Sequence, residues 1–150
     1  MKLYLIQHGL SLPEDVDPKK GLSEKGKLET VKMVLFLKMR KIKADIIWHS
    51  KKLRSIQTAQ ILAEHIPDAK TQERDNLNPQ DPVEKFPQEI QALNKDLMIA
   101  GHLPFLQKLA SRLLSGQEAH EFIFFKNSGV VCLENKETWK IMWVLIPDLL

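Results

Sequence analysis

Four polar residues of the chain could together hold and transfer an anionic group. His8, Ser50 and His102 each directly follow a short apolar segment, and Arg54 lies four residues beyond Ser50. An arginine offers a planar fork of donors that matches the oxygens of a phosphoryl group. A neutral imidazole can attack phosphorus as a nucleophile, and a second one can donate to oxygens on which negative charge develops. These residue types therefore indicate a phosphoryl site, provided that the fold brings them together.

Each of these residues also has a simpler explanation. A histidine such as His8 can cap a turn at the end of a strand, and Ser50 can serve only as a helix N-cap. Arg54 can be an exposed helix residue, and Gly9 and Gly101 can be required by turn geometry alone. The functional interpretation is favoured because three separate segments end in residues that suit one chemistry.

The elements that must position these residues alternate between strands and helices. Apolar runs bounded by turn residues predict strands at residues 2–7, 44–49, 96–100, 130–133 and 140–146. Helices are predicted from an N-cap at Ser23 to about Arg40, after Ser50, at about residues 87–94 and after Pro104. The segments between them, residues 10–21 and 76–82, are predicted to be loops.

Helical spacing predicts which side chains of these helices face the core. For the first helix they are Leu28, Val31, Leu35 and Met39. For the second they are Leu53, Ile56, Ala59, Leu62 and Ile66, and for the last Leu106, Leu109 and Leu113.

This alternation predicts an α/β fold of three layers, in which a mixed, mainly parallel sheet has helices on both faces. The turn at residues 134–138 predicts an antiparallel hairpin at the end of the sheet. Ligands of open α/β sheets bind beyond the carboxyl ends of the strands. His8, Ser50 and His102 are expected to meet there.

Length and composition are those of one globular domain. The chain has 150 residues, of which 43% are hydrophobic and 27% charged, so residues 1–150 are expected to form a single domain. The net charge of +3 does not by itself indicate a nucleic-acid partner. Residues 3–6 are too short an apolar run for a signal peptide, and no run approaches the length of a membrane span. We therefore expect a cytoplasmic protein without a nucleic-acid or membrane partner.

Other kinds of site are less well supported. A single cysteine and the lack of a His-Glu-x-x-His segment argue against a zinc site, and we expect no metal and no cofactor. Cys132, in an apolar strand, is expected to be a small buried hydrophobe. The basic residues 38–43 (KMRKIK) could form a basic patch, but a solvated helix end is the preferred interpretation. We expect structural roles for His49, His65 and His120.

Four segments of the sequence resemble the motifs of the histidine phosphatase superfamily. They are LYLIQHGLS, GLSEKGKLE, HSKKLRSIQTAQIL and MIAGHLPFLQKLASRLL, and they occur in the order found in that family. The short chain and the Gly-His-x-Pro-x-Leu segment are similar to the small SixA-like branch, the phosphohistidine phosphatases. The resemblance implies a phosphoglycerate mutase-like fold, consistent with the three-layer prediction.

The resemblance also implies roles for individual residues. His8 would be the nucleophile that carries the phosphoryl group, Arg54 would bind the phosphoryl oxygens, and His102 would be the second histidine of the pocket. Gly9 would allow close approach of the substrate, and Ser11 would lie near the phosphate. The phosphoryl group would pass to His8 and then to water without a metal, from a histidine-phosphorylated protein or a small phosphorylated substrate.

The sequence departs from the family pattern in two respects. Gln7 occupies the position at which the family has an arginine, so a neutral amide replaces a fixed charge in the substrate-binding set. A charge-assisted hydrogen bond contributes about 1.5 to 3 kcal/mol against about 1 for a neutral one. No acidic residue matches a general-acid motif, although Glu73, Asp75 and Asp81 lie in about the right region. A phosphoramidate substrate could explain this absence, because its leaving imidazole can be protonated without a dedicated carboxylate.

Two classes of function therefore stay open. The first is a phosphatase that acts through His8, and the second is a phosphate-binding or phosphoprotein-binding module weakened by Gln7. The intact set of His8, Arg54 and His102 favours the enzyme. The short loop at residues 10–21 would leave the site open, which suits a bulky phosphoprotein better than a small sugar phosphate.

Overall fold

The computed structural model describes all 150 residues, which form six strands, four α-helices and a short 3₁₀ helix. The strands are β1 (Lys2–Gln7), β2 (Ile46–His49), β3 (Lys70–Glu73), β4 (Leu97–Gly101), β5 (Val130–Asn135) and β6 (Trp139–Leu145). The helices are α1 (Glu24–Met39), α2 (Leu53–His65), α3 (Phe86–Leu93), α4 (Phe105–Ser115) and the 3₁₀ helix η1 (Pro147–Leu149). The predicted elements are all present, with ends displaced by one or two residues.

The strands form one mixed sheet in the order β3-β2-β4-β1-β5-β6. The four strands from β3 to β1 are parallel, whereas β5 runs antiparallel to β1 and forms a hairpin with β6. The prediction of a mainly parallel sheet with an antiparallel end is therefore confirmed. One consequence matters for function: β2, β4 and β1 lie side by side, so their carboxyl ends meet at one edge.

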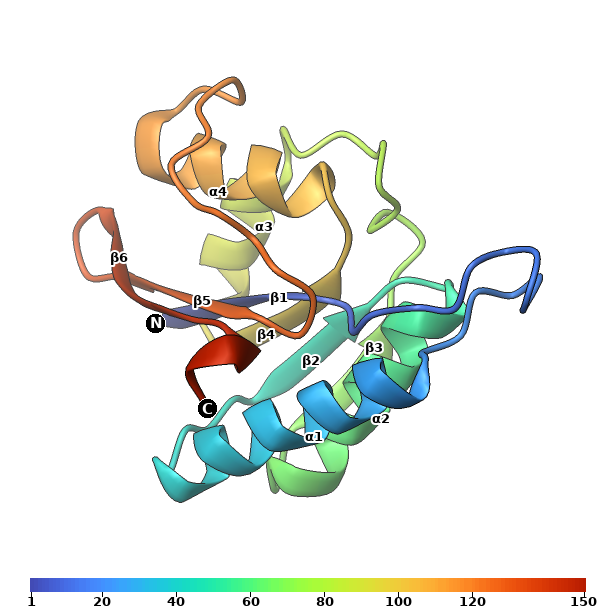
Figure 1. Cartoon of the computed structure of the whole chain (residues 1–150). Helices are drawn as coiled ribbons and strands as arrows, with labels where there is room; N and C mark the ends of the chain where they lie inside the picture. The colour runs from blue at the N-terminus through green and yellow to red at the C-terminus, as the bar shows by residue number, and fades with distance from the viewer.

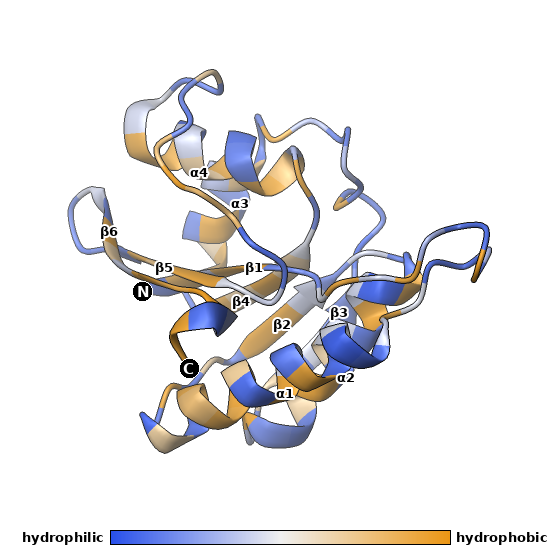
Figure 2. Ribbon diagram, viewed as in Figure 1, coloured by the Kyte–Doolittle hydropathy of each residue, from blue (hydrophilic) through white to orange (hydrophobic).

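Helices cover both faces of the sheet, as predicted (Figure 1). α1 and α2 lie on one face, and α3 and α4 lie on the other. Alternation along β1 sends Leu3 and Leu5 into the core under α3 and α4, and Tyr4 and Ile6 into the core under α1 and α2. Figure 2 shows hydrophobic residues along the central strands and hydrophilic ones in most of the projecting loops. No helix is both long and apolar enough to cross a bilayer.

The core-facing side of α1 was predicted wrongly. Leu28, Leu35 and Met39 are exposed, with 69% of Leu28 and 79% of Met39 accessible to solvent. The buried residues of the helix are Gly26, Thr30, Met33, Val34 and Leu37. Both sets have helical spacing, so periodicity alone could not choose between them. The buried face includes Gly26 and Thr30, which are not apolar, so a search for apolar residues at helical spacing does not find it. Small and polar residues are needed there because α1 meets the end of β1.

The other helices agree better with the prediction. Ser23 caps α1 as expected, because its hydroxyl accepts a hydrogen bond from the backbone N–H of Gly26 at 3.0 Å. In α2, Leu53 and Ile56 are half-buried rather than buried. Buried residues that follow the predicted stripes are Ala59, Leu62 and Ile66 in and just after α2, and Leu106, Leu109 and Leu113 in α4.

The strand β3 was not predicted. Its four residues, KTQE, are polar and exposed, and the strand lies at the edge of the sheet beside β2. A short edge strand without an apolar side carries no hydrophobic pattern that could reveal it. Its pairing with β2 is made by backbone hydrogen bonds.

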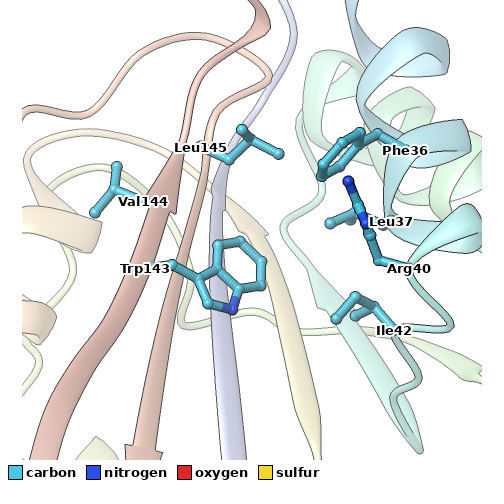
Figure 3. Close-up of a pocket in the computed structure, with 7 residues that line it drawn as sticks. All are labelled: Phe36, Leu37, Arg40, Ile42, Trp143, Val144 and Leu145. Carbon is cyan, nitrogen blue, oxygen red and sulfur yellow. The ribbon is translucent and has the colours of Figure 1, made fainter. Parts of the chain in front are cut away.

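The basic segment 38–43 is a solvated helix end. Lys38, Arg40, Lys41 and Lys43 are exposed, and the guanidinium of Arg40 lies 5.1 Å above the ring of Phe36. Close by, an apolar pocket of about 240 Å³ lies between the last turns of α1 and β6 (Figure 3). Its residues are Phe36, Leu37, Arg40, Ile42, Trp143, Val144 and Leu145. It lies at the opposite end of α1 from Gly26, and so away from the strand ends that carry the polar residues.

Candidate active site

The structure brings His8, Ser50, Arg54 and His102 together at the carboxyl ends of three neighbouring strands. His8 follows β1, Ser50 follows β2, and His102 follows β4. The backbone N–H of His8 donates to the carbonyl oxygen of Gly101 at 3.0 Å, which extends the β1–β4 pairing to the site. The predicted convergence of these residues is therefore observed.

His8 is held in the form that a nucleophile requires. Its Nδ1 lies 2.8 Å from the carbonyl oxygen of Gly9, which can only accept, so Nδ1 carries the ring proton. The lone pair is then on Nε2, and the Nε–H of Arg54 donates to Nε2 at 3.2 Å. The nitrogen that could attack phosphorus is therefore next to the cation that could bind the phosphoryl oxygens.

His102 is the second imidazole of the site and is almost completely buried. Its ring centroid lies 5.0 Å from that of His8. A hydrogen bond of 2.6 Å joins its Nε2 to the Oγ of Ser50. The other ring nitrogen, Nδ1, is buried and has no hydrogen-bond partner in the protein. A buried polar atom without a partner is costly, and an oxygen of a bound anion could satisfy it.

Both histidines are neutral at physiological pH. Burial lowers the pKa of His8 to about 4, and the positive charges of Arg54 and Lys20 act in the same direction. Burial also lowers the pKa of His102 to about 3, with smaller contributions from His8, Arg54 and Lys52. A phosphoryl group brings negative charge, which favours the protonated form of an adjacent imidazole. The site therefore combines a neutral imidazole at His8, the candidate nucleophile, with a second neutral histidine whose pKa a bound anion would raise.

Hydroxyl groups that were not predicted as site residues fix the start of α2. The Oγ of Ser55 donates to the carbonyl oxygen of Ala100 and accepts from the backbone N–H of Ser50. Thr58 donates to the carbonyl oxygen of Arg54 and accepts from the N–H of Gly9 at 3.0 Å. These contacts connect β1, β2 and β4 to the turn that carries Arg54. Thr58 lies in the segment HSKKLRSIQTAQIL, so the resemblance of that segment to the family was the sequence signal that could have indicated it.

Close packing requires glycine at position 9, directly after His8, and at position 26, in the first turn of α1. A Cβ at Gly9 would lie 2.7 Å from the Oγ1 of Thr30, and one at Gly26 would lie 2.1 Å from the carbonyl oxygen of Leu10. The absence of a side chain at both positions lets the start of α1 pack directly against the turn that follows β1. Packing is thus a sufficient reason for Gly9, and its approach to a substrate stays a prediction.

Gln7 lies beside the site but makes no specific side-chain contact. Its Oε1 is buried without a partner, while its carbonyl oxygen accepts from the N–H of Ser128 at 3.0 Å. Asn127, which was not singled out in the sequence, donates from Nδ2 to the carbonyl oxygen of His8 at 2.9 Å. Ser11 lies three residues after His8, in an isolated bridge with Leu22, and its side chain makes no hydrogen bond. The phosphate-binding roles of Gln7 and Ser11 stay predictions.

None of the three acidic candidates contacts His8, Arg54 or His102. The carboxylate of Asp75 is exposed and pairs with Lys51 at 2.6 Å. Asp81 accepts from the N–H of Asn78, and Glu73 is exposed at the end of β3. The protein thus has no carboxylic acid in direct contact with its candidate nucleophile.

The other histidines predicted to be structural, and Cys132, have contacts or burial that suit a structural role. The Nδ1 of His49 lies 2.9 Å from the carbonyl oxygen of Ser50, and that of His65 lies 3.0 Å from the carbonyl oxygen of Ile61. Cys132 is buried in β5, and this burial raises the pKa of its thiol to about 11. No cluster of three or more metal-ligating side chains could hold a metal ion.

The architecture is that of the phosphoglycerate mutase-like α/β proteins, as the sequence resemblance implied. Solved structures that share it include SixA phosphohistidine phosphatases and other members of the histidine phosphatase superfamily. The protein histidine phosphatase SixA complexed with tungstate is 20% identical over 99% of both chains, with a TM-score of 0.87.

Two other solved structures show how widely this fold is shared. A mycobacterial glucosyl-3-phosphoglycerate phosphatase complexed with VO3 is 15% identical, over 95% of this chain and 97% of its own, with a TM-score of 0.76. The alpha-ribazole phosphatase from Shigella flexneri is 16% identical, over 94% of this chain and 95% of its own, with a TM-score of 0.72. At the level of sequence, no protein-family model and no curated protein matches the chain.

Proposed function

We propose that the protein is a phosphatase that uses Nε2 of His8 as its nucleophile and releases the phosphoryl group to water. The observation that carries this proposal is the state of His8: Nδ1 is protonated, and Nε2 keeps its lone pair beside the Arg54 guanidinium. The oxyanions bound to two proteins of the same fold, tungstate and VO3, support a site for an oxyanion.

The reaction would proceed in two displacements. Nε2 of His8 attacks the phosphorus, the bond to the leaving group breaks, and the leaving group departs with a proton that comes from solvent water. Water then attacks the phosphorus of phosphohistidine, the P–N bond breaks, and inorganic phosphate leaves while His8 regains its neutral form. Arg54, which contacts Nε2 in the free protein, would turn its donors to the phosphoryl oxygens. His102 would use its unpartnered Nδ1 to contact the same group.

The substrates we propose are phosphohistidine in a protein and related phosphoramidates, with simple phosphomonoesters cleaved more slowly. The reason is the lack of a carboxylic acid next to His8. The imidazole of a phosphohistidine can leave as a neutral molecule once its other ring nitrogen carries a proton taken from water, whereas a strongly basic alkoxide needs an acid that protonates it as the bond breaks. Equal rates on a phosphoramidate and an alkyl phosphate would contradict this preference.

The test is to trap the phosphoenzyme. The protein is mixed with radiolabelled phosphoramidate and quenched in alkali, in which phosphohistidine survives, and an acid-treated sample should lose the label. We expect one labelled histidine peptide, the one that contains His8, and no label in His8→Ala. Persistence of the label in that variant would reject His8 as the nucleophile. His65→Ala is the matched control and should label like the wild type.

One observation favours a second candidate, a module that binds a phosphoryl group without turnover. Gln7 provides no charge, and its amide oxygen faces no donor. A protein that binds vanadate but never forms the labelled intermediate would support this alternative. The proposal of a phosphatase requires both binding and label.

A further inference from the structure

A hollow of about 420 Å³ opens next to Arg54, and the reaction proposed above makes no use of most of it. One of its walls is the loop at residues 10–21, and the other is the segment that leads into α2. Its residues are Glu14, Pro18, Lys19, Lys20, Lys51, Lys52, Leu53 and Arg54. The two walls are tied together, because the N–H of Leu22 donates to the Oε1 of Gln57 at 2.7 Å. We call this feature the basic hollow.

The basic hollow has more cationic side chains than carboxylates that could pair with them. Five cations line it, against the single carboxylate of Glu14. Lys51 pairs with Asp75, but none of the other ion pairs of the structure involves Lys19, Lys20, Lys52 or Arg54. Unpaired like charges repel one another, so this cluster adds nothing to the stability of the fold.

The position of the cluster joins it to the candidate active site. Arg54 belongs to both, since it lines the basic hollow and donates to His8. A phosphoryl group held by His8, Arg54 and His102 would occupy only the inner end. The four lysines line the rest of the hollow, from the loop and from the segment before α2, and its volume of about 420 Å³ exceeds that of one phosphoryl group.

We propose that the basic hollow docks acidic side chains that flank the phosphorylated residue of a protein substrate. This inference rests on the proposed function and adds to it the charge of the partner. Lysines are flexible, strongly hydrated point charges, which suit several separated carboxylates better than one small, rigid ligand. Charges at the rim of an interface mainly raise the association rate and select the partner. Phosphoproteins with acidic surroundings would therefore be the preferred substrates.

The experiment compares two synthetic phosphohistidine peptides of equal length, one with glutamates around the phosphorylated residue and one with glutamines at the same positions. Phosphoramidate serves as the small substrate that does not reach the lysines. The variant is Lys19→Glu/Lys51→Glu, which reverses two charges of the basic hollow that do not contact His8, Arg54 or His102. Lys43→Glu, an exposed lysine before β2 at the other end of the sheet, is the matched control.

We expect kcat/KM of the wild type to be about tenfold higher for the glutamate peptide than for the glutamine peptide at low salt. The double variant should cleave the two peptides with equal kcat/KM, while its kcat/KM for phosphoramidate should change by less than about threefold. Lys43→Glu should keep the preference for the glutamate peptide. The preference should also shrink in 1 M NaCl, where the screening length is about 3 Å.

Equal kcat/KM values for the two peptides in the wild type would overturn the inference while leaving the phosphatase intact. A preference for a small bisphosphorylated compound over both peptides would overturn it too, because the lysines would then serve a second phosphate. If neither peptide nor phosphoramidate is cleaved, it is the proposed function that fails.

Discussion

Arg54 donates from Nε to the Nε2 atom of His8 across 3.2 Å, so the cation proposed to bind the anion and the candidate nucleophile are in direct contact. This hydrogen bond blocks the lone pair of Nε2. It also keeps the guanidinium within reach of any group that becomes attached to that nitrogen. An anion that accepts hydrogen bonds from the Arg54 guanidinium would replace this contact and leave the lone pair of Nε2 free to react.

The first prediction concerns this guanidinium. Arg54→Lys keeps the charge but loses the planar fork of donors, so transition-state contacts of about 1.5 to 3 kcal/mol should weaken. We expect kcat/KM for phosphoramidate to fall about 10- to 150-fold, since about 1.4 kcal/mol corresponds to a factor of ten. Arg112→Lys, in α4, is the control and should keep full activity. An unchanged rate for Arg54→Lys would mean that Arg54 does not bind the phosphoryl oxygens.

The second prediction concerns Gln7. Gln7→Arg should add the missing charge to the site and raise kcat/KM about five- to thirtyfold, equivalent to roughly 1 to 2 kcal/mol. Gln7→Met, of similar size, removes the unpartnered amide oxygen and should leave the free energy of unfolding unchanged or increased. Steady-state kinetics and urea unfolding measure the two effects. If Gln7→Met loses activity as severely as an Arg54 variant, the amide itself serves the reaction.

The convergence of His8, Ser50 and His102 could be predicted from sequence because each of them follows the end of an apolar strand. The strands that precede His8, Ser50 and His102 are buried on both faces, and such segments are conspicuous in a sequence. Their convergence then follows from the general behaviour of parallel sheets. The strand order that makes β1 and β2 both neighbours of β4 was not predicted.

The residues that were missed act through the backbone or through packing. Thr58, Ser55 and Asn127 bind carbonyl oxygens or N–H groups of segments far away in the sequence. A single hydroxyl or amide carries no periodic signal, so it becomes visible only in three dimensions. The wrong face of α1 has the same origin, since Gly26 and Thr30 pack closely without being apolar.

The third prediction is that His8 and His102 stay neutral well below the usual range of histidine. Burial lowers the pKa of His8 to about 4 and that of His102 to about 3, against about 6.5 for an exposed imidazole. ¹⁵N NMR of the histidine rings should show no titration of either ring between pH 8 and pH 5. The spectrum of His8 should show a protonated Nδ1 and an unprotonated Nε2. A midpoint of His8 near 6.5 would contradict the buried, cation-flanked site.

The fourth prediction concerns how the free energy of unfolding depends on pH, and it follows from the same two pKa values. Both folded-state pKa values lie below the unfolded value of about 6.5, so the unfolded chain binds more protons between about pH 6.5 and 4. The free energy of unfolding should therefore decrease as the pH falls through this window, by up to about 1.4 kcal/mol per pH unit for each histidine.

Urea unfolding in phosphate-free buffers measures this dependence. His8→Ala/His102→Ala should show a shallower decline between pH 6.5 and 4 than the wild type, even if its stability at pH 7 differs. Parallel curves for the two proteins would show that neither histidine is buried in its neutral form.

The fifth prediction tests the junction that places the turn after β1. By helix propensity alone, replacing a helical glycine with alanine should stabilise the protein by about 1 kcal/mol. At Gly26 the added Cβ would lie 2.1 Å from the carbonyl oxygen of Leu10, a backbone atom that cannot move without displacing Gly9 and His8. Overpacking typically costs about 1 to 3 kcal/mol, so Gly26→Ala should be less stable than the wild type, with reduced phosphoramidate cleavage.

The control is Gly116→Ala after α4: nothing lies within 4 Å of its Cβ, but its φ is +77°. That variant should lose about 1 kcal/mol of stability and keep its activity. If Gly26→Ala were instead more stable and fully active, the start of α1 would not fix the position of His8.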